Sequence, residues 1–225
     1  ESILQVENLS KYFGGLAAVS NCSLKIKKGS ITGIIGPNGS GKTSLFNVLA
    51  GYVTPNYGNI IIDKVDIKNF DMGSYKKKVG VFNQNPKLLN CSLLDNYLYA
   101  NPNLKLKEIS SIIEACHLSN FVDSLKDGLN TNLHEINSEV NSSLLKMIAF
   151  SKMMSNNHEV LFLDEPTEGL DVKNSQIIYN YINNQINENK IVVIFSKDPY
   201  IIKGANNLIT LSLDDGSYLI SNPRE

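Results

Sequence analysis

The sequence contains no apolar run that approaches the roughly 20 residues needed to cross a bilayer. Its longest apolar stretches, such as Ile191–Phe195, are only as long as a β-strand. The N-terminus also lacks a basic region followed by an apolar stretch, so we expect no signal peptide. It lacks an initiating Met as well, which leaves open that the chain is part of a longer polypeptide.

The sequence also has few cysteines and no excess of charge of either sign large enough to mark a class of partner. The three cysteines, Cys22, Cys91 and Cys116, lie far apart without a C-x-x-C pair, which favours neither disulfides nor zinc and fits a reducing cytosol. Basic residues number 21 and acidic residues 22. A dedicated nucleic-acid binder usually has a basic excess, so no nucleic-acid partner is expected. Arg224 is the only arginine, which removes arginine from phosphate recognition.

What is present is a chain of 225 residues, 42% of them hydrophobic, which is enough for a real core and excludes wholesale disorder. Apolar runs of strand length alternate with helical patterns, and this predicts an α/β fold with a mostly parallel, covered sheet. Residues 11–15 are expected to form an aromatic turn, and Asp215-Gly216 the turn of a closing hairpin. The expected strands are 3–6, 22–26, 31–35, 60–62, 79–82, 160–163, 191–195, 208–213 and 218–220.

Helical patterns are expected at 42–50 and between the strands at 160–163 and 191–195. They dominate from residue 86 to residue 155. We therefore predict an α/β core of residues 1–85 and 156–225, with an antiparallel β part at its N-terminal end. Residues 86–155 are predicted to form an inserted helical subdomain.

Residues 36–43, GPNGSGKT, match the phosphate-binding pattern G-x-x-x-x-G-K-[ST] between an expected strand and an expected helix. Glycines let successive backbone N–H groups face one anion, and the helix N-terminus adds partial positive charge. Lys42 can reach the β- and γ-phosphates, and the Thr43 hydroxyl can ligate Mg²⁺. The alternative is a glycine-rich turn with an incidental lysine. The predicted binding residues here are Gly36, Asn38, Gly39, Ser40, Gly41, Lys42, Thr43 and Ser44.

Two adjacent carboxylates, Asp164 and Glu165, end the expected strand 160–163. Ligands of α/β sheets bind at the carboxyl ends of the strands. Asp164 is predicted to hold Mg²⁺ and Glu165 to act as the general base toward an attacking water. An acidic pair at a strand end is by itself more often a cap or turn, but its place after a P-loop favours the metal-and-base interpretation.

With both motifs in place, the chain resembles the ATP-binding-cassette (ABC) ATPase domain over almost its whole length. The resemblance implies a P-loop NTPase core, ATP and Mg²⁺ as cofactors, and adenine stacking on Phe13, with Tyr12 as the alternative and core packing as a further one. Gln84 matches the Q-loop glutamine, which contacts Mg²⁺ and the attacking water. It could equally be an ordinary polar residue at a strand end.

The family works as a head-to-tail dimer in which each ATP lies between the P-loop of one domain and the LSGGQ signature of the other. Residues 168–171 match the D-loop, so the resemblance implies that Asp171 acts across the dimer interface. Asp171 could also cap the following helix. A second ABC domain, identical or different, and transmembrane domains are therefore the implied partners.

The signature itself departs from the family. Counting back from the helix at 148–152 places it at residues 140–144, VNSSL, and Glu135 matches a glutamate often found upstream. Asn141, Ser142 and Ser143 replace the serine and both glycines. Asn141 or Ser142 can still cap the helix, but the two Cβ atoms stand where the family brings backbone close to phosphate. We expect weaker recognition of the γ-phosphate in trans.

The second departure is Lys197, which stands where the family has a histidine after the strand 191–195. A neutral histidine can both donate and accept, whereas lysine only donates, from a flexible stem. Lys197 could neutralise γ-phosphate charge, could pair with Glu165 and blunt that base, or could simply be solvated. We expect a domain that binds Mg·ATP but hydrolyses it slowly when it pairs with itself.

The function that the resemblance favours is the ATPase subunit of a membrane transporter, at the cytoplasmic face of the membrane. Segments 88–94 and 128–135 look like exporter cassettes, while 9–51 looks more like importer or free-standing ones, a mild lean to export. The alternatives are a soluble ABC protein without a transport role and a regulatory ATP-binding module with little catalysis. A P-loop kinase would lack the matches at Gln84 and 168–171.

Overall fold

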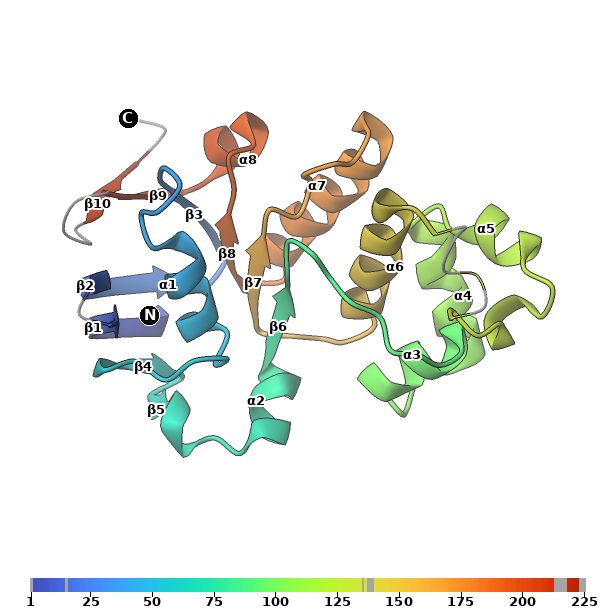
Figure 1. Cartoon of the computed structure of the whole chain (residues 1–225), viewed down its shortest axis with the longest axis horizontal. Coiled ribbons are helices and arrows are strands. Elements are labelled where there is room, and N and C mark those ends of the chain that lie inside the picture. Colours follow the sequence, from blue (N-terminus) through green and yellow to red (C-terminus); the bar gives the residue numbers. More distant parts are fainter. Residues whose placement is uncertain (1, 15, 135, 137–139, 213–217, 223–225) are drawn as a thin grey trace. The chain divides into compact units, whose positions relative to one another are not determined.

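The computed structural model describes residues 2–14, 16–134, 136, 140–212 and 218–222 (Figure 1). The chain divides into two compact units. The first comprises Glu1–Val81, His158–Pro166 and Tyr181–Glu225, and the second comprises Phe82–Asn157 and Thr167–Asn180.

An antiparallel sheet lies in the first unit, in the order β2-β1-β4-β5. Its strands are β1 (Ser2–Phe13), β2 (Leu16–Lys27), β4 (Tyr57–Ile62) and β5 (Val65–Asp66). The predicted aromatic turn at 11–15 was wrong at its start, because Lys11 pairs with Val19 and Tyr12 with Ala17, so β1 continues to Phe13. Pairing with β2, a contact that is not local in sequence, extends the strand past the start of the predicted turn.

The second sheet has the order β10-β9-β3-β8-β7-β6. Strand β3 runs parallel to both β8 and β9, β7 runs parallel to β8, and β10 pairs antiparallel with β9, which confirms the prediction of a mostly parallel sheet. The turn predicted around Asp215-Gly216 lies outside the described residues. The strands are β3 (Ser30–Ile35), β6 (Val79–Phe82), β7 (Val160–Asp164), β8 (Ile191–Phe195), β9 (Asn207–Leu211) and β10 (Tyr218–Ser221).

The central strands of this sheet are buried, as expected for continuous apolar runs in a parallel sheet. All five residues of β8 are buried, and the ring of Phe195 meets that of Phe46 edge-on at 5.4 Å between centroids. This contact packs helix α1 against the sheet and so anchors the segment that precedes α1. The helices α1 (Lys42–Leu49), α2 (Met72–Lys78) and α8 (Pro199–Gly204) and the 3-10 turn η1 (Ile67–Asn69) belong to this unit.

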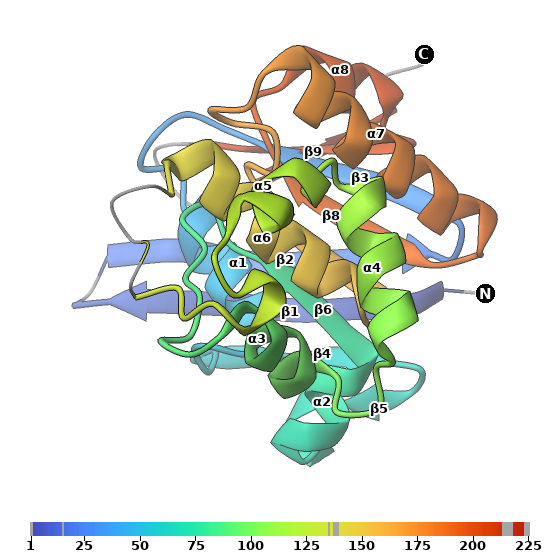
Figure 2. The ribbon, with the colours of Figure 1, turned by 90° about the vertical axis from the view of Figure 1, so that its right-hand side faces the viewer.

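The second unit is helical, and its helices α3 to α6 can be followed in Figure 2. Its core includes a buried hydrogen bond of 2.6 Å between the hydroxyls of Tyr97 and Ser151, and burial raises the pKa of Tyr97 to about 12. No helix among the described residues is both long and apolar enough to span a membrane. The elements are α3 (Leu93–Ala100), α4 (Leu106–Ala115), α5 (Ser119–Ser124), η2 (Gly128–Asn130) and α6 (Ser142–Met154); α7 (Val172–Asn187) has residues in both units.

Candidate functional site

The glycine-rich loop runs from the end of β3 to the start of α1, as the sequence predicts. Gly41 caps α1 with a φ of 88°, a left-handed conformation that favours glycine. A Cβ atom at Gly41 would overlap the backbone carbonyl oxygen of Ala18 in β2. The loop is therefore shaped by the neighbouring strand as well as by its own sequence.

The loop has features that fit a phosphate ligand. The ammonium of Lys42 folds over the loop and donates to the carbonyl oxygens of Gly36 and Pro37, the latter at 2.9 Å. The hydroxyl of Ser40 is buried and has no hydrogen-bond partner among the described residues. Such orphaned polar atoms are uncommon in folded proteins, so a ligand that supplies a partner would be stabilised here.

Two carboxylates stand at the carboxyl end of β7. Asp164 is the last residue of that strand, and Glu165 adopts a φ of 42°, a left-handed conformation that costs a non-glycine residue roughly 1–3 kcal/mol. The backbone of Glu165 is tied to β8 by a 2.8 Å bond from its N–H to the carbonyl oxygen of Phe195. Its Oε2 accepts hydrogen bonds from the Ser196 hydroxyl and the Lys197 N–H, both at 3.2 Å. The Glu165 side chain is thus held in one orientation.

Lys197 reaches the glycine-rich loop with its side chain. Its Nζ donates to Oδ1 of Asn38 at 3.2 Å. Burial lowers the pKa of Lys42, and the positive charge of Lys197 lowers it further, whereas Glu165 and Asp164 act in the opposite direction. Two ammonium groups and two carboxylates therefore share one site in the first unit.

Ser196 was not predicted as a site residue, although a signal was available. It is the first polar residue after the fully apolar strand β8, at the same edge of the sheet as Asp164. It is 2% exposed and accepts a hydrogen bond from the backbone N–H of Asp198 at 3.0 Å.

The exposed aromatic side chains of the first unit include the predicted stacking residue. Phe13 is 51% exposed at the end of β1, so it is not a core residue. The ammonium of Lys11 lies 5.2 Å from its ring centroid. Tyr12, the alternative, packs edge-on against Tyr57 at 6.3 Å. Phe13 therefore presents more open ring surface than Tyr12, which is 37% exposed.

The other predicted site residues lie in the second unit. Gln84 donates through Nε2 to Oε2 of Glu168 at 2.6 Å. Asp171 accepts a hydrogen bond from the backbone N–H of Asn174 at 2.8 Å, the pattern of a helix N-cap at the start of α7.

The degenerate signature segment forms the N-terminus of α6. Asn141 caps the helix, since its side-chain oxygen accepts from the Leu144 N–H at 2.8 Å. Ser142 is exposed and Ser143 half-buried in the first turn of the helix. Glu135, matched to an upstream glutamate of the family, lies outside the described residues.

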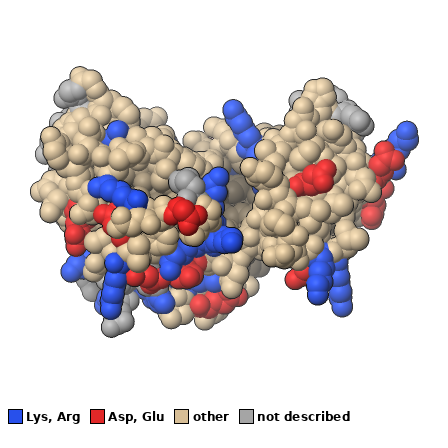
Figure 3. All heavy atoms as spheres, turned by 90° about the horizontal axis from the view of Figure 1, so that it is seen from below, with Lys and Arg blue, Asp and Glu red and all other residues tan. Residues whose placement is uncertain are grey.

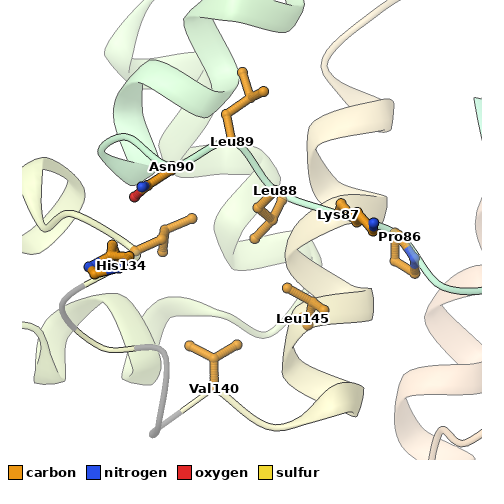
Figure 4. Close-up of a pocket in the computed structure, with 9 residues that line it drawn as sticks. Pro86, Lys87, Leu88, Leu89, Asn90, His134, Val140 and Leu145 are labelled. Atoms are coloured by element: carbon orange, nitrogen blue, oxygen red, sulfur yellow. The ribbon is translucent and has the colours of Figure 1, made fainter.

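A cavity of about 340 Å³ opens in the second unit (Figure 4). It combines the segment after Gln84 with the first turn of α6 and is mainly apolar, with Lys87, Asn90 and His134 as its polar members. The lining residues are Pro86, Lys87, Leu88, Leu89, Asn90, Leu133, His134, Val140 and Leu145.

For Mg²⁺, the donor set is a hydroxyl and a carboxylate. No group of three His, Cys, Asp or Glu residues that could hold a metal occurs in the part of the chain that the structure describes. Mg²⁺ usually keeps several waters and binds through one or two protein oxygens plus phosphate oxygens. Thr43 and Asp164 in the first unit supply oxygen donors of this kind, so the residues fit the ion.

The family model described as "ABC transporter" matches residues 19–168. This chain belongs to the ABC transporter family. Members of the family bind ATP, generally with Mg²⁺, and are in general ATPases. The fold of this ABC domain is similar to that of a bacterial Atm1-family ABC exporter solved with ATP bound, with a TM-score of 0.85, 21% identity, and coverage of 96% of this chain and 38% of that one.

Curated relatives of this ABC domain include ATP-binding proteins named for alpha-hemolysin translocation and for leukotoxin export. The alpha-hemolysin translocation ATP-binding protein HlyB of Proteus vulgaris is 28% identical over 211 residues, which cover 91% of this chain and 30% of that protein. The leukotoxin export ATP-binding protein LtxB of Aggregatibacter actinomycetemcomitans is 28% identical over 193 residues, or 86% of this chain and 27% of that protein. The chain thus spans less than a third of the length of these relatives.

Proposed function

We propose that this domain binds Mg·ATP on the 36–43 loop and is the ATP-hydrolysing subunit of a membrane transporter. The observation that carries the proposal is the electrostatic interaction of Lys42 with Asp164 and Glu165, beside a glycine-rich loop whose Ser40 hydroxyl has no hydrogen-bond partner within the described part of the chain. The loop N–H groups, the N-terminus of α1 and Lys42 would bind the phosphates. Phe13 would stack on the adenine, since the residue is 51% exposed.

Each of the remaining core residues has a proposed role. Thr43 and Asp164 would hold Mg²⁺, which supplies charge neutralisation to the phosphates when it is bound. Glu165 would accept a proton from the attacking water, with its carboxylate oriented by the Ser196 hydroxyl and the Lys197 N–H. Gln84 is proposed as a further Mg²⁺ ligand on the family resemblance alone.

We further propose that hydrolysis is slow when the domain pairs with itself. In a head-to-tail dimer, Asn141, Ser142 and Ser143 would face the partner's ATP, and Asp171 would act across the interface. The Asn141 side chain is committed to the cap of α6, and two serine side chains replace glycines at that helix N-terminus. Lys197 can donate but not accept, so it cannot relay a proton as a histidine can. A different, intact ABC domain as partner would supply an intact signature to the ATP of this chain. Lys197 would still stand where the family has a histidine.

The cavity of the second unit is the proposed docking place for a short helix of a transmembrane domain. Its apolar lining with a few polar groups suits the apolar face of such a helix. The domain would then work at the cytoplasmic face of the membrane, and the toxin-exporting relatives favour export. Acidic and basic side chains are interspersed on the face seen in Figure 3, so the charge pattern gives no support to a nucleic-acid partner.

Isothermal titration calorimetry tests the nucleotide site. We expect the chain to bind ATP, more tightly with Mg²⁺ than in EDTA, and Lys42→Ala to abolish binding. Lys203→Ala, an exposed lysine on α8, is the control and should bind normally. No ATP binding by the wild-type chain would overturn the proposal.

A regulatory ATP-binding module is the second candidate. Two features of the signature segment favour it: serines replace its glycines, and the Asn141 side chain is used to cap α6. Such a module would bind ATP without turnover even beside an intact partner domain. Transporter function predicts co-purification with a membrane protein and ATPase activity in that complex.

A further inference from the structure

The ring of Phe13 is accompanied by a cation from its own strand. Side chains alternate between the two faces of a strand, so Lys11 and Phe13 of β1 lie on the same face. The ammonium of Lys11 lies over the Phe13 ring, 5.2 Å from its centroid, which is the geometry of a cation–π contact. Nothing so far gives Lys11 a function.

Lys11 is anchored at its tip as well as through its backbone. Its Nζ donates a 2.9 Å hydrogen bond to the carbonyl oxygen of Thr54, which lies between α1 and β4. Asn56 of the same segment fixes the neighbouring backbone. Its Oδ1 accepts from the Tyr12 N–H and its own N–H donates to the carbonyl oxygen of Ser10, both at 2.9 Å. The flexible stem of the lysine is thus held at both ends, so its ammonium has a defined place beside the ring.

The end of β1 that carries Phe13 lies close to the glycine-rich loop of the same unit. The register with β2 shifts by one residue between Lys11 and Tyr12, which leaves Ala18 as the extra residue of a β-bulge. This bulge abuts the loop, since a Cβ atom added at Gly41 would overlap the Ala18 carbonyl oxygen. The base and the phosphates of a nucleotide belong to one ligand, so an exposed aromatic ring beside a phosphate-binding loop is a place for the base to stack.

We propose that Lys11 is a positioning residue that holds the Phe13 ring in the orientation for stacking on the base of bound ATP. A ring that is oriented before binding raises the fraction of chains that are competent to bind. This rests on the proposed function, because the ring has a base to stack on only if the chain binds a nucleotide. It goes beyond that function by giving Lys11 a role in which its charge acts on the ring and not on the phosphates.

The first test detects the contact by NMR and needs no nucleotide. Protons over the face of an aromatic ring are shifted upfield by the ring current, so the Hε resonances of Lys11 should lie upfield of ordinary lysine values. They are assigned from their loss in Lys11→Met. We expect them to return to ordinary values in Phe13→Leu, while those of Lys25, an exposed lysine of β2, stay in place. Lys11 resonances that do not move in Phe13→Leu would overturn the proposal.

The second test compares, by calorimetry with Mg²⁺, the binding of ATP and of inorganic tripolyphosphate, which has no base. An exposed cation–π contact is worth about a two- to five-fold change in an equilibrium constant, so Lys11→Met should weaken ATP binding by about that factor. Tripolyphosphate binding should be unchanged. Lys11→Arg, which keeps a cation for the ring, should retain most of the ATP affinity. The control, Lys25→Met, should match the wild-type chain with both ligands.

A double-mutant cycle tests whether the effect passes through the ring. In the Phe13→Leu background, Lys11→Met should cause no further loss of ATP affinity. A loss that persists there, or an equal loss for tripolyphosphate, would mean that Lys11 attracts the phosphates directly and would overturn the positioning role. Unchanged or tighter ATP binding in Lys11→Met would overturn it too. Absence of ATP binding in the wild-type chain would instead defeat the proposed function, and the role of Lys11 with it.

Discussion

The ammonium of Lys197 donates a hydrogen bond to the side-chain oxygen of Asn38 at 3.2 Å, although the two residues lie 159 positions apart. The same residue donates its backbone N–H to Glu165. Lys197 therefore contacts both the phosphate-binding loop and the proposed base, but with different groups. Its side-chain charge lies at the loop, where it adds to that of Lys42.

Replacing Lys197 with Met should weaken ATP binding more than ADP binding. The variant removes one of the two cations near the loop. ATP carries more negative charge than ADP, so its binding should depend more on that second cation. We expect a loss of about five- to ten-fold for ATP and less than about two-fold for ADP, because the exposed side chain is partly screened. Calorimetry of both nucleotides measures this, with Lys203→Met as the control. Equal losses for the two nucleotides would contradict it.

Phe13→Ala should lower ATP affinity without unfolding the domain. Stacking of a base on an aromatic ring is worth about 1–3 kcal/mol, so a loss of roughly ten-fold is expected. The ring is 51% exposed, so the free energy of unfolding should change by less than about 0.5 kcal/mol. Tyr12→Ala decides between the two aromatic residues: a larger affinity loss in that variant would assign the stacking to Tyr12.

Asn141→Ala should destabilise the chain by about 1 kcal/mol, the usual cost of an N-cap. The side chain of Asn141 satisfies the Leu144 N–H, which otherwise lacks an intrahelical partner. Urea unfolding measures the change. Asn141→Ser keeps a capping oxygen and should retain most of the stability, and Ser142→Ala should be nearly neutral. If Ser142→Ala proves as costly as Asn141→Ala, the cap has been assigned to the wrong residue.

His158 should make the chain less stable in mild acid. Burial lowers its pKa below the ordinary 6.5, and the charge of Lys190 adds to this, while the bond of Nδ1 to the Lys77 carbonyl opposes it. As the pH falls below 6.5, the unfolded chain gains a proton that the folded chain still resists. Stability is then full above this pH and is lost as the pH falls through the folded-state pKa. The unfolding free energy, measured from pH 8 to about pH 5, should therefore depend less on pH in His158→Gln than in the wild-type chain. His117→Asn, which replaces an exposed histidine, should keep the wild-type pH dependence.

The sequence predicted the elements that follow local rules. Strand β8 was predicted with its observed bounds, and α1 begins at Lys42 as predicted, because continuous apolar runs and a glycine-rich loop before a helix are local signals. Capping of α6 is also a local signal, and the sequence predicted either Asn141 or Ser142 as the cap. The turn at 11–15 failed because strand pairing, which is not local, extended β1.

The contacts of the site could not be predicted in this way. Lys197 was left between three interpretations, since the sequence does not show which carbonyl, carboxylate or amide a flexible lysine reaches. The partner of Gln84 depends on the geometry of a turn 84 residues away. Residue types and spacing identified the members of the site, but the pairing between them follows from the packing of strands and turns that are distant in sequence.

The most direct measurement is steady-state ATP hydrolysis by the purified chain beside three repaired variants. These are Lys197→His, a variant with Leu-Ser-Gly-Gly-Gln at residues 140–144, and the combination of both. We expect the wild-type chain to be slow and the combined variant to be faster by at least roughly ten-fold, since donors that face developing charge are worth this much or more. Wild-type turnover as high as that of the combined variant would contradict the proposal that Lys197 and residues 140–144 limit hydrolysis.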